Sequence, residues 1–155
     1  GVGDSGNFIE LAKDGFKVTV LDISNKIIKE IRDLCKRKKI KVNAISQDVR
    51  NFKFKRKYDF ILCNGLLHFL TRKEGYNLLN NLKEYTNKKG INILLTNQVY
   101  SSFENNRVES VGGEMVKKLC NCIIRLERNP RKLIKEKPIV YEDLFEIKDE
   151  GICLK

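Results

Sequence analysis

The sequence predicts an α/β fold, in the form of a Rossmann-like, doubly wound and mostly parallel sheet. Two observations lead to this prediction. Short apolar, β-branched stretches alternate with segments of helical periodicity along residues 7–97, and such alternation is typical of parallel strands joined by right-handed helical crossovers. The chain also opens on a glycine-rich loop, Gly1–Gly6. Loops of this kind join a buried strand to a helix and let a ligand approach the backbone.

The glycine-rich loop has no apolar stretch in front of it. Because a loop of this kind normally follows a buried strand, we expect the first strand of the sheet to be missing and the sequence to be a fragment. The residues upstream of Gly1 are expected to form an apolar run of about five residues that ends in an acid or its equivalent.

Helices and strands are predicted in alternation up to residue 97. Apolar spacing indicates helices at residues 7–13, about 25–38 and about 72–85, with a short helical turn at 66–70. Ser24 and Thr71 stand where N-caps are expected. Strands are predicted at residues 16–21, ending at Asp22, and at 40–45, 60–63 and 91–95.

The pattern weakens after residue 97. Residues 98–110 are polar and loop-like, and a stripe of apolar residues in 111–128 predicts a helix. Pro130 and Pro138 bracket a basic stretch, and residues 141–147 and 152–154 are candidates for short strands. We therefore expect a single domain over residues 1–155, in which 1–97 form the ligand-binding half and 98–155 a poorly defined C-terminal part.

Composition excludes several classes of protein. An apolar content of 41% in 155 residues excludes a disordered chain, and no run is long enough to span a bilayer. The formal net charge of +11 is compatible with a polyanion partner such as RNA. However, the basic residues are dispersed and no aromatic residues interleave with them as stacking platforms. We favour a lysine-rich surface over a nucleic-acid interface, and expect no membrane association.

The five cysteines fit neither a zinc site nor a disulfide framework. Their number is odd and their spacing matches no zinc-binding pattern. Cys63 lies inside an apolar run, where cysteine acts as a small core residue. We expect reduced thiols, no metal and a cytoplasmic location.

Polar residues follow the predicted strands, and these are the candidates for a binding site. They are the Gly1–Gly6 loop, Asp22, Gln47-Asp48 and Asn64-Gly65. In an open parallel sheet, ligands bind beyond the carboxyl ends of the strands, so these residues are expected to converge. Asp22 can accept hydrogen bonds from a ribose diol, Asp48 from an adenine amine, and Asn64 can both donate and accept. The set predicts a pocket for an adenosine-containing cofactor.

Each of these residues also has a purely structural interpretation. Asp22 with Ser24 can form a helix cap, Asp48 can close a turn, and Asn64-Gly65 is a common turn pair. A glycine pattern taken alone is weak support for a ligand. The occurrence of all four features in this order is what favours the cofactor interpretation.

Residues 1–97 resemble class I S-adenosylmethionine-dependent methyltransferases. The resemblance is carried by GVGDSGN at 1–7, by KDGFKVTVLDIS at 13–24 and by YDFILCNGLLHFL at 58–70, which resembles the fourth-strand motif of that family. The segment at 82–95, LKEYTNKKGINILL, is most similar to the tellurite-resistance methyltransferase branch. The resemblance implies a seven-stranded sheet with one antiparallel strand, and S-adenosyl-L-methionine as cofactor.

The resemblance also implies which residues contact that cofactor. These positions are Gly1, Val2, Gly3, Asp22, Ile23, Asp48, Val49 and Asn64. Asp22 corresponds to the ribose-binding acid, Asp48 with Val49 to the adenine side, and Asn64 to the methionine side. The chain departs from the family at the third glycine of the loop, where Ser5 precedes Gly6.

The implied reaction is methyl transfer to a small-molecule acceptor. The sulfonium methyl group is already activated, so the protein mainly supplies proximity, and a soft thiol or chalcogen anion needs no dedicated base. The catalytic residue is therefore left unassigned. His68, the only histidine, follows the fourth-strand motif; it is a candidate proton acceptor and equally a packing residue.

Three alternatives remain open from the sequence. A short-chain NAD(P)-dependent dehydrogenase needs a Tyr-x-x-x-Lys pair after the fifth strand, whereas Tyr85 and Lys89 precede it. A nucleic-acid methyltransferase is compatible with the charge, but Asn64-Gly65-Leu66-Leu67 is no base-clamping motif. The third alternative is an inactive fragment, which titration with S-adenosylmethionine distinguishes from an enzyme.

Overall fold

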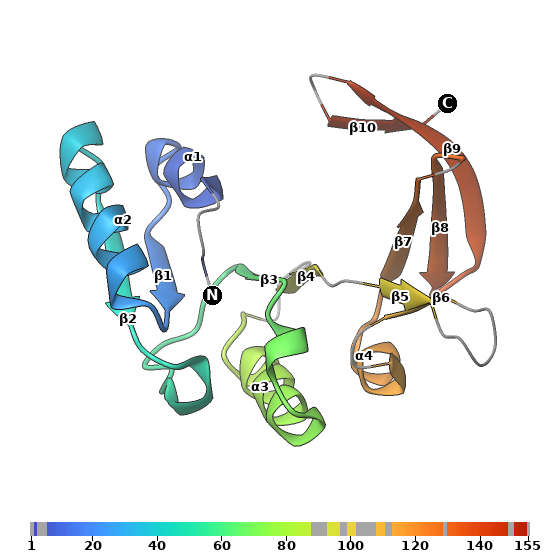
Figure 1. The fold of residues 1–155 in the computed structure, drawn as a ribbon, viewed down its shortest axis with the longest axis horizontal. Coiled ribbons are helices and arrows are strands. Elements are labelled where there is room, and N and C mark those ends of the chain that lie inside the picture. The colour runs from blue at the N-terminus through green and yellow to red at the C-terminus, as the bar shows by residue number, and fades with distance from the viewer. Residues whose placement is uncertain are drawn as a thin grey trace. The chain divides into compact units, whose positions relative to one another are not determined.

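The computed structural model describes residue 2 and residues 6–87, 93–96, 99–101, 108–110, 113–128, 130–148 and 151–154 (Figure 1). The chain divides into two compact units, residues 1–112 and residues 113–155, and each is described by itself. The predicted division at residue 97 falls inside the first unit, since the boundary between the units follows residue 112.

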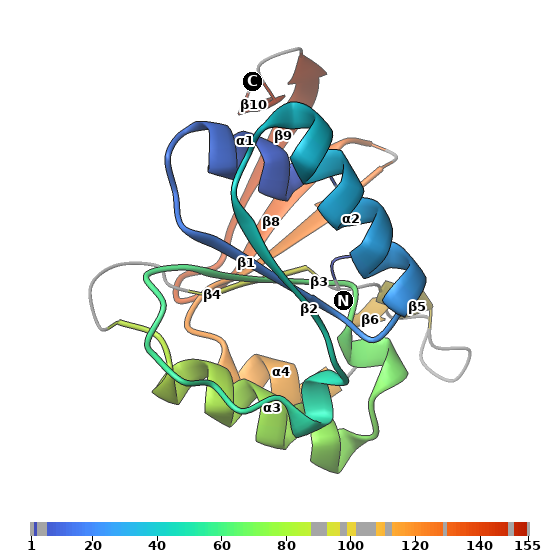
Figure 2. The same cartoon turned by 90° about the vertical axis from the view of Figure 1, so that its left-hand side faces the viewer.

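The first unit begins with two helices packed on a pair of parallel strands. The elements are α1 (Asn7–Lys13), β1 (Val18–Asp22), α2 (Asn25–Lys38) and β2 (Val42–Ser46). β1 and β2 pair from Val18↔Val42 to Asp22↔Ser46, and α2 runs alongside them (Figure 2). Apolar side chains of all four elements form one buried cluster, which contains Phe8, Val20, Ile28, Ile31, Cys35 and Ala44. The predicted helices have the observed bounds, and the two strands begin two residues later than predicted.

Helix α2 begins and ends where its sequence favours it. The Ser24 hydroxyl accepts a hydrogen bond from the Ile27 N–H at 3.3 Å, which satisfies one of the unpaired donors of the first turn. Lys39 ends the helix in the left-handed conformation, with φ of 54°. The Arg32 guanidinium donates to the Ala44 carbonyl at 2.7 Å and ties α2 to β2.

A second parallel pair follows in the same unit. It consists of η1 (Val49–Asn51), β3 (Ile61–Asn64), η2 (Leu67–Phe69), α3 (Arg72–Glu84) and β4 (Ile93–Thr96). β3 and β4 pair in register from Ile61↔Ile93 to Asn64↔Thr96. Leu78, Leu79 and Leu82 of α3 are buried, as their spacing predicts. Residues 91 and 92 of the predicted fifth strand lie outside the described residues.

The segment after residue 97 contains strands that the sequence analysis missed. β5 (Val99–Ser101) and β6 (Val108–Ser110) pair antiparallel within the stretch predicted as a loop. The loop prediction is therefore wrong at these positions. Two three-residue strands carry too short a pattern to be distinguished from a polar loop without their partner.

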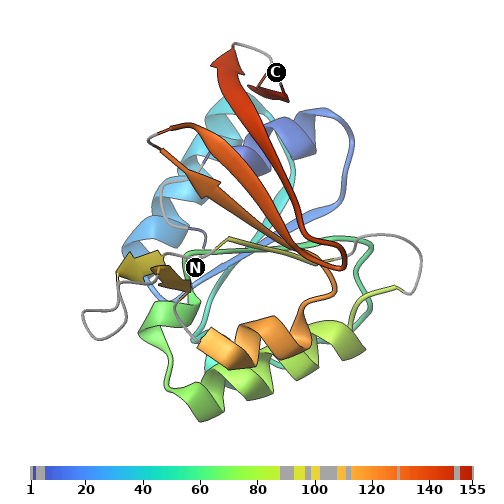
Figure 3. The same ribbon diagram turned by 90° about the vertical axis from the view of Figure 1, so that its right-hand side faces the viewer.

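The second unit is one short helix and an antiparallel sheet (Figure 3). Its elements are α4 (Gly113–Leu119), β7 (Ile123–Glu127), β8 (Lys132–Lys137), β9 (Tyr141–Lys148) and β10 (Gly151–Leu154), with sheet order β10-β9-β8-β7. The helix predicted for residues 111–128 is wrong beyond Leu119. The β-branched pair Ile123-Ile124 belongs to a strand whose partly buried and exposed residues alternate.

The basic stretch between the two prolines is also a strand. β8 lies between β7 and β9, and two of its charged side chains form ion pairs with these neighbours: Lys132 contacts Glu142 at 2.7 Å, and Glu136 contacts Arg125 at 3.0 Å. Antiparallel pairing in the described residues is thus more extensive than the one antiparallel strand that the resemblance implied. No helix among the described residues is long and apolar enough to cross a membrane.

Candidate functional site

The carboxyl ends of β1 and β2 meet at one edge of the first unit. Asp22 ends β1 opposite Ser46, and the Asp22 carbonyl accepts from the Gln47 N–H at 2.9 Å. The opening segment reaches the same edge, because the Val2 N–H donates to the Leu21 carbonyl at 3.1 Å. Gly1 and Gly3 lie outside the described residues. The backbone thus places Val2, Asp22 and Gln47 close together, as parallel strand topology requires.

Asp22 is buried at the end of its strand. Only 7% of the residue is exposed, and its Oδ1 atom accepts from the Ser24 N–H at 2.9 Å. This contact is the helix-capping role that the sequence left open for Asp22. It engages one carboxylate oxygen and leaves the cofactor role of Asp22 a prediction. The neighbouring Ile23 is 66% exposed, as an apolar residue that covers a flat ligand ring would be.

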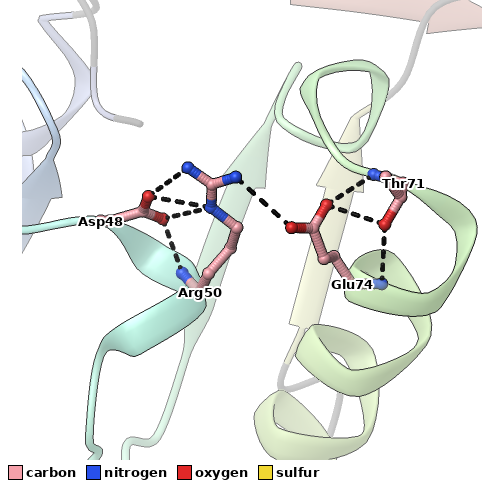
Figure 4. Close-up of polar contacts among 4 residues, drawn as sticks. All are labelled: Asp48, Arg50, Thr71 and Glu74. Atoms are coloured by element: carbon pink, nitrogen blue, oxygen red, sulfur yellow. Dashed lines mark hydrogen bonds and ion pairs between the residues drawn. The ribbon is translucent and has the colours of Figure 1, made fainter.

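Asp48 follows β2 and is held by Arg50 (Figure 4). Its Oδ1 accepts from the Arg50 backbone N–H and from Arg50 Nε, both at 2.9 Å. Its Oδ2 accepts from Arg50 Nε at 2.8 Å and from Arg50 Nη2. These hydrogen bonds, those of the Arg50 side chain first, hold the pKa of the Asp48 carboxyl below its ordinary value. Asp48 also caps η1, which begins at Val49.

The Arg50 side chain also contacts the first turn of α3 (Figure 4). Arg50 Nη1 lies 3.3 Å from Glu74 Oε1. Glu74 Oε2 accepts from the Thr71 N–H and from the Thr71 hydroxyl, both at 2.8 Å, and closes a capping box. Hydrogen bonds from Thr71, backbone first, lower the pKa of the Glu74 carboxyl. Arg50 is not among the predicted site residues, although an arginine two residues after the aspartate that follows a strand is a signal for such a pair.

Asn64 ends β3 and faces the end of β4. Its Oδ1 accepts a hydrogen bond from the Thr96 hydroxyl, and the Gly65 N–H donates to the Thr96 carbonyl at 3.1 Å. Gly65 has a φ of 53°, so the turn after β3 needs a residue that tolerates the left-handed region. Asn64 therefore has the turn geometry that its sequence also predicted, and its side chain remains exposed.

A groove of about 730 Å³ lies beside these strand ends in the first unit. Its walls are residues 18–21 of β1 and residues 60–64 around β3, with contributions from α1 and α3. Of the predicted site residues, Val2, Val49 and Asn64 line this groove, whereas Asp22, Ile23 and Asp48 are not among its lining residues. Convergence of all of them on one cavity stays a prediction.

His68 lies in η2, just beyond Asn64. Its ring packs at 3.9 Å between centroids against Phe69, and its Nδ1 atom is buried without a hydrogen-bond partner in the described part of the chain. Its Cε1 atom lies 3.7 Å from where a Cβ would stand on Gly65. Both the proton-acceptor and the packing interpretations of His68 remain predictions.

The structure also bears on two other kinds of site, the Tyr-x-x-x-Lys pair of a dehydrogenase and a metal site. Tyr85 ends α3 and stacks on Phe54 at 5.2 Å between ring centroids, so its ring takes part in packing, while Lys89 lies outside the described residues. Among the residues that the structure describes, no three His, Cys, Asp or Glu side chains are grouped so that they would hold a metal ion.

Solved structures that resemble this chain include S-adenosylmethionine-dependent methyltransferases. TehB from Haemophilus influenzae matches with a TM-score of 0.61 at 17% identity, over 96% of this chain and 50% of that one. Magnesium protoporphyrin IX methyltransferase from Synechocystis, solved with bound S-adenosylmethionine, matches with 0.55 at 20% identity, over 92% and 62%. A methyltransferase from Clostridium acetobutylicum matches with 0.52 at 13% identity, over 97% and 59%. These matches confirm the predicted Rossmann-like α/β fold.

The sequence comparisons narrow this class to one family. The family model of tellurite resistance protein TehB matches residues 1–105, and the chain belongs to this family. A relative from Haemophilus influenzae Rd, described as probable S-adenosyl-L-methionine-dependent methyltransferase TehB, is 25% identical over 95 residues. These residues are 61% of this chain and 33% of that protein, so the chain spans a third of the length of this relative. The predicted branch of methyltransferases is confirmed.

Proposed function

We propose that this chain binds S-adenosyl-L-methionine and serves methyl transfer to a small-molecule acceptor. Membership of the TehB family supports the activity. The observation in the structure that carries the proposal is the meeting of Val2, Asp22 and Gln47 at the carboxyl edge of β1 and β2. A parallel α/β sheet binds nucleotide-like ligands at this edge.

The donor and acceptor groups at this edge fit an adenosyl group. Asp22 would accept from the ribose hydroxyls, and the side chains of Ile23 and Val49 would offer apolar contact to the adenine ring. Asn64, exposed at the end of β3, would bind the polar tail, and Gly1, Val2 and Gly3 would pass along the backbone side of the ligand. Asp48 fits less simply, because Arg50 already engages both of its oxygens.

S-adenosylmethionine would supply an activated methyl group on a sulfonium, so the protein needs to orient the reactants and exclude water. In this chain the strand-end residues fix the ligand, and no residue is required to remove a proton when the acceptor is a soft anion such as a thiolate. We therefore propose an acceptor of this kind, a small molecule with a soft nucleophilic atom, and no catalytic base. His68 would then act by packing beside the site.

Equilibrium titration of the chain with S-adenosylmethionine tests this proposal. Asp22→Asn keeps one oxygen for the Ser24 N–H but loses the charge that strengthens hydrogen bonds to hydroxyl groups. We expect binding about tenfold weaker or more, since hydrogen bonds to charged groups are the strong ones. Asp33→Asn, on the exposed surface of α2, is the matched control and should bind as the unmodified chain does.

Two results would contradict the proposal. If saturating S-adenosylmethionine gives neither heat nor a thermal shift, the chain does not bind this cofactor, and the proposed methyl transfer is excluded with it. If the Asp22 and Asp33 variants lose the same affinity for S-adenosylmethionine, Asp22 does not contact the cofactor. Retention of RNA that depends on salt and competes with the cofactor would favour a nucleic-acid acceptor over a small molecule.

A further inference from the structure

Basic side chains gather near the amino ends of β1 and β2, at the end of the sheet opposite to the candidate cofactor site. A hollow of about 530 Å³ opens there in the first unit, between these strand ends, the second half of α2 and the segment before β3. Of the ten residues that line it, none is acidic and five are basic: Lys17, Arg32, Lys36, Lys41 and Arg56.

These five cations form no ion pair with a carboxylate in the described part of the chain. The ion pairs found there engage other basic residues, such as Lys13, Arg50 and Lys132. Like charges that share a hollow repel one another, and a nearby acid would normally relieve the repulsion. The negative end of the α2 dipole accounts for Lys36, but not for the cations that precede β1, β2 and β3. A counter-charge from solution is therefore expected at this hollow.

Two of the five cations are held in place by contacts within the first unit. Arg32 Nη2 donates to the Ala44 carbonyl at 2.7 Å. The Arg56 guanidinium lies over the Tyr58 ring, 5.2 Å from its centroid, and its Nη2 donates to the Thr19 hydroxyl at 3.5 Å. A guanidinium has five N–H donors, so both groups keep donors for a ligand. Positioned guanidinium groups bind phosphate oxygens in pairs.

The floor of the hollow is apolar, and its lining contains no aromatic side chain. The five cations are exposed, whereas the apolar lining residues are buried or half-buried: Val18, Cys35, Ile40 and Val42. Apolar surroundings strengthen the attraction between opposite charges. Bases of a single-stranded nucleic acid stack on aromatic rings, and the Tyr58 ring next to this lining already contacts Arg56. The lining therefore fits a compact anion of high charge better than a nucleic-acid strand.

We propose that this hollow binds a small polyphosphate anion, either inorganic or the phosphate chain of a nucleotide. Such a chain carries several negative charges on neighbouring groups, which matches the density of cations in the lining. Its oxygens accept hydrogen bonds from Arg32 and Arg56, while Lys17, Lys36 and Lys41 neutralise the remaining charge. The proposal is independent of methyl transfer, because the hollow and the candidate cofactor site lie at opposite ends of β1 and β2.

Calorimetric titration with sodium tripolyphosphate at 0.15 M ionic strength tests this assignment. Lys36→Gln and Lys41→Gln should each weaken binding about tenfold, because each removes a charged hydrogen-bond donor. Lys38→Gln is the matched control, since Lys38 lies in the same last turn of α2 as Lys36, is exposed and does not line the hollow. This variant makes the same change in net charge and should alter the affinity less than about twofold, because salt screens charges outside the hollow.

Further titrations identify the source of the phosphate chain and the results that would overturn the proposal. If ATP binds more tightly than tripolyphosphate, with an affinity that depends on Lys36, the ligand is a nucleotide; otherwise it is an inorganic chain. Absence of tripolyphosphate binding, displacement by sulfate at the same ionic strength, or equal losses in the Lys36 and Lys38 variants would overturn the proposal. So would displacement of tripolyphosphate by poly-U RNA, since the hollow would then belong to a nucleic-acid surface.

Discussion

Asp48 has the structural role that its sequence position allows, whereas its role in cofactor binding stays a prediction. Four hydrogen bonds from Arg50 reach its two oxygens, and a carboxylate offers about four lone-pair sites. An adenine amine would therefore have to displace part of this set. The sequence could predict that a carboxylate stands at this strand end, but not its partner, because the guanidinium geometry depends on the turn of η1. At Asp22 the prediction of a cap is met directly by Ser24.

Replacing Arg50 should change how the two carboxylates titrate. Both have folded pKa values below the ordinary range near 4. The stability they provide is thus present above that range and is lost as pH falls through the lowered values. In Arg50→Gln we expect the pKa of Asp48 to rise most, that of Glu74 less, and unfolding between about pH 5 and 2 to depend less on pH. Carboxyl carbon NMR titration measures this, with Arg37→Gln as the control. Unchanged pKa values would contradict the assigned network.

At the scale of elements, the helices could be predicted because their signals lie within their own residues. The strands of the second half could not, because they depend on pairing with other strands. Helix α3 carries both its cap, Thr71 with Glu74, and its apolar stripe within its own residues, so its bounds were predictable. β8 has a basic, mixed sequence and is a strand because β7 and β9 pair with it on either side. Strand stability of this type comes from cross-strand neighbours, which are distant in sequence. The same reason explains why β5 and β6 were missed.

The capping box of α3 provides a direct test of these local signals. Thr71→Ala removes the hydroxyl that accepts from the Glu74 N–H at 3.3 Å. We expect the free energy of unfolding to fall by about 1 kcal/mol, as for other N-cap replacements. Thr71→Ser retains the hydroxyl and should fall by clearly less. Urea unfolding of both variants measures the difference, and equal losses would show that the methyl group, not the cap, stabilises the helix.

At the scale of the whole molecule, the chain has a net charge of +11, and several of its basic side chains pair with nearby carboxylates. Lys13 contacts Glu10 at 2.9 Å, Lys132 contacts Glu142, and Lys148 contacts Glu146 at 2.9 Å. Surface pairs of this kind contribute little stability, but they break up a continuous basic surface.

The family and the fold could be predicted from residues 1–97, because strand ends and glycines recur at fixed places along parallel sheets. The C-terminal unit has no such sequence pattern.

This distribution predicts weak and unspecific retention of nucleic acid. Filter binding of single-stranded RNA should detect an association at low salt that disappears near physiological ionic strength, because dispersed cations release few counterions together. Poly-U and a mixed sequence should behave alike. Retention above 0.15 M salt, where the Debye length is about 8 Å, together with a preference for one sequence would contradict this expectation.

The double use of Glu74 has a consequence for how these sequences vary. One oxygen of this carboxylate closes the start of α3 and the other receives Arg50. Losing the acid would leave a guanidinium without its second partner, while losing the arginine would free the acid to serve the helix alone. Among homologous sequences, substitutions at position 50 should therefore be tolerated beside Glu74, whereas replacement of Glu74 should be accompanied by a change at position 50.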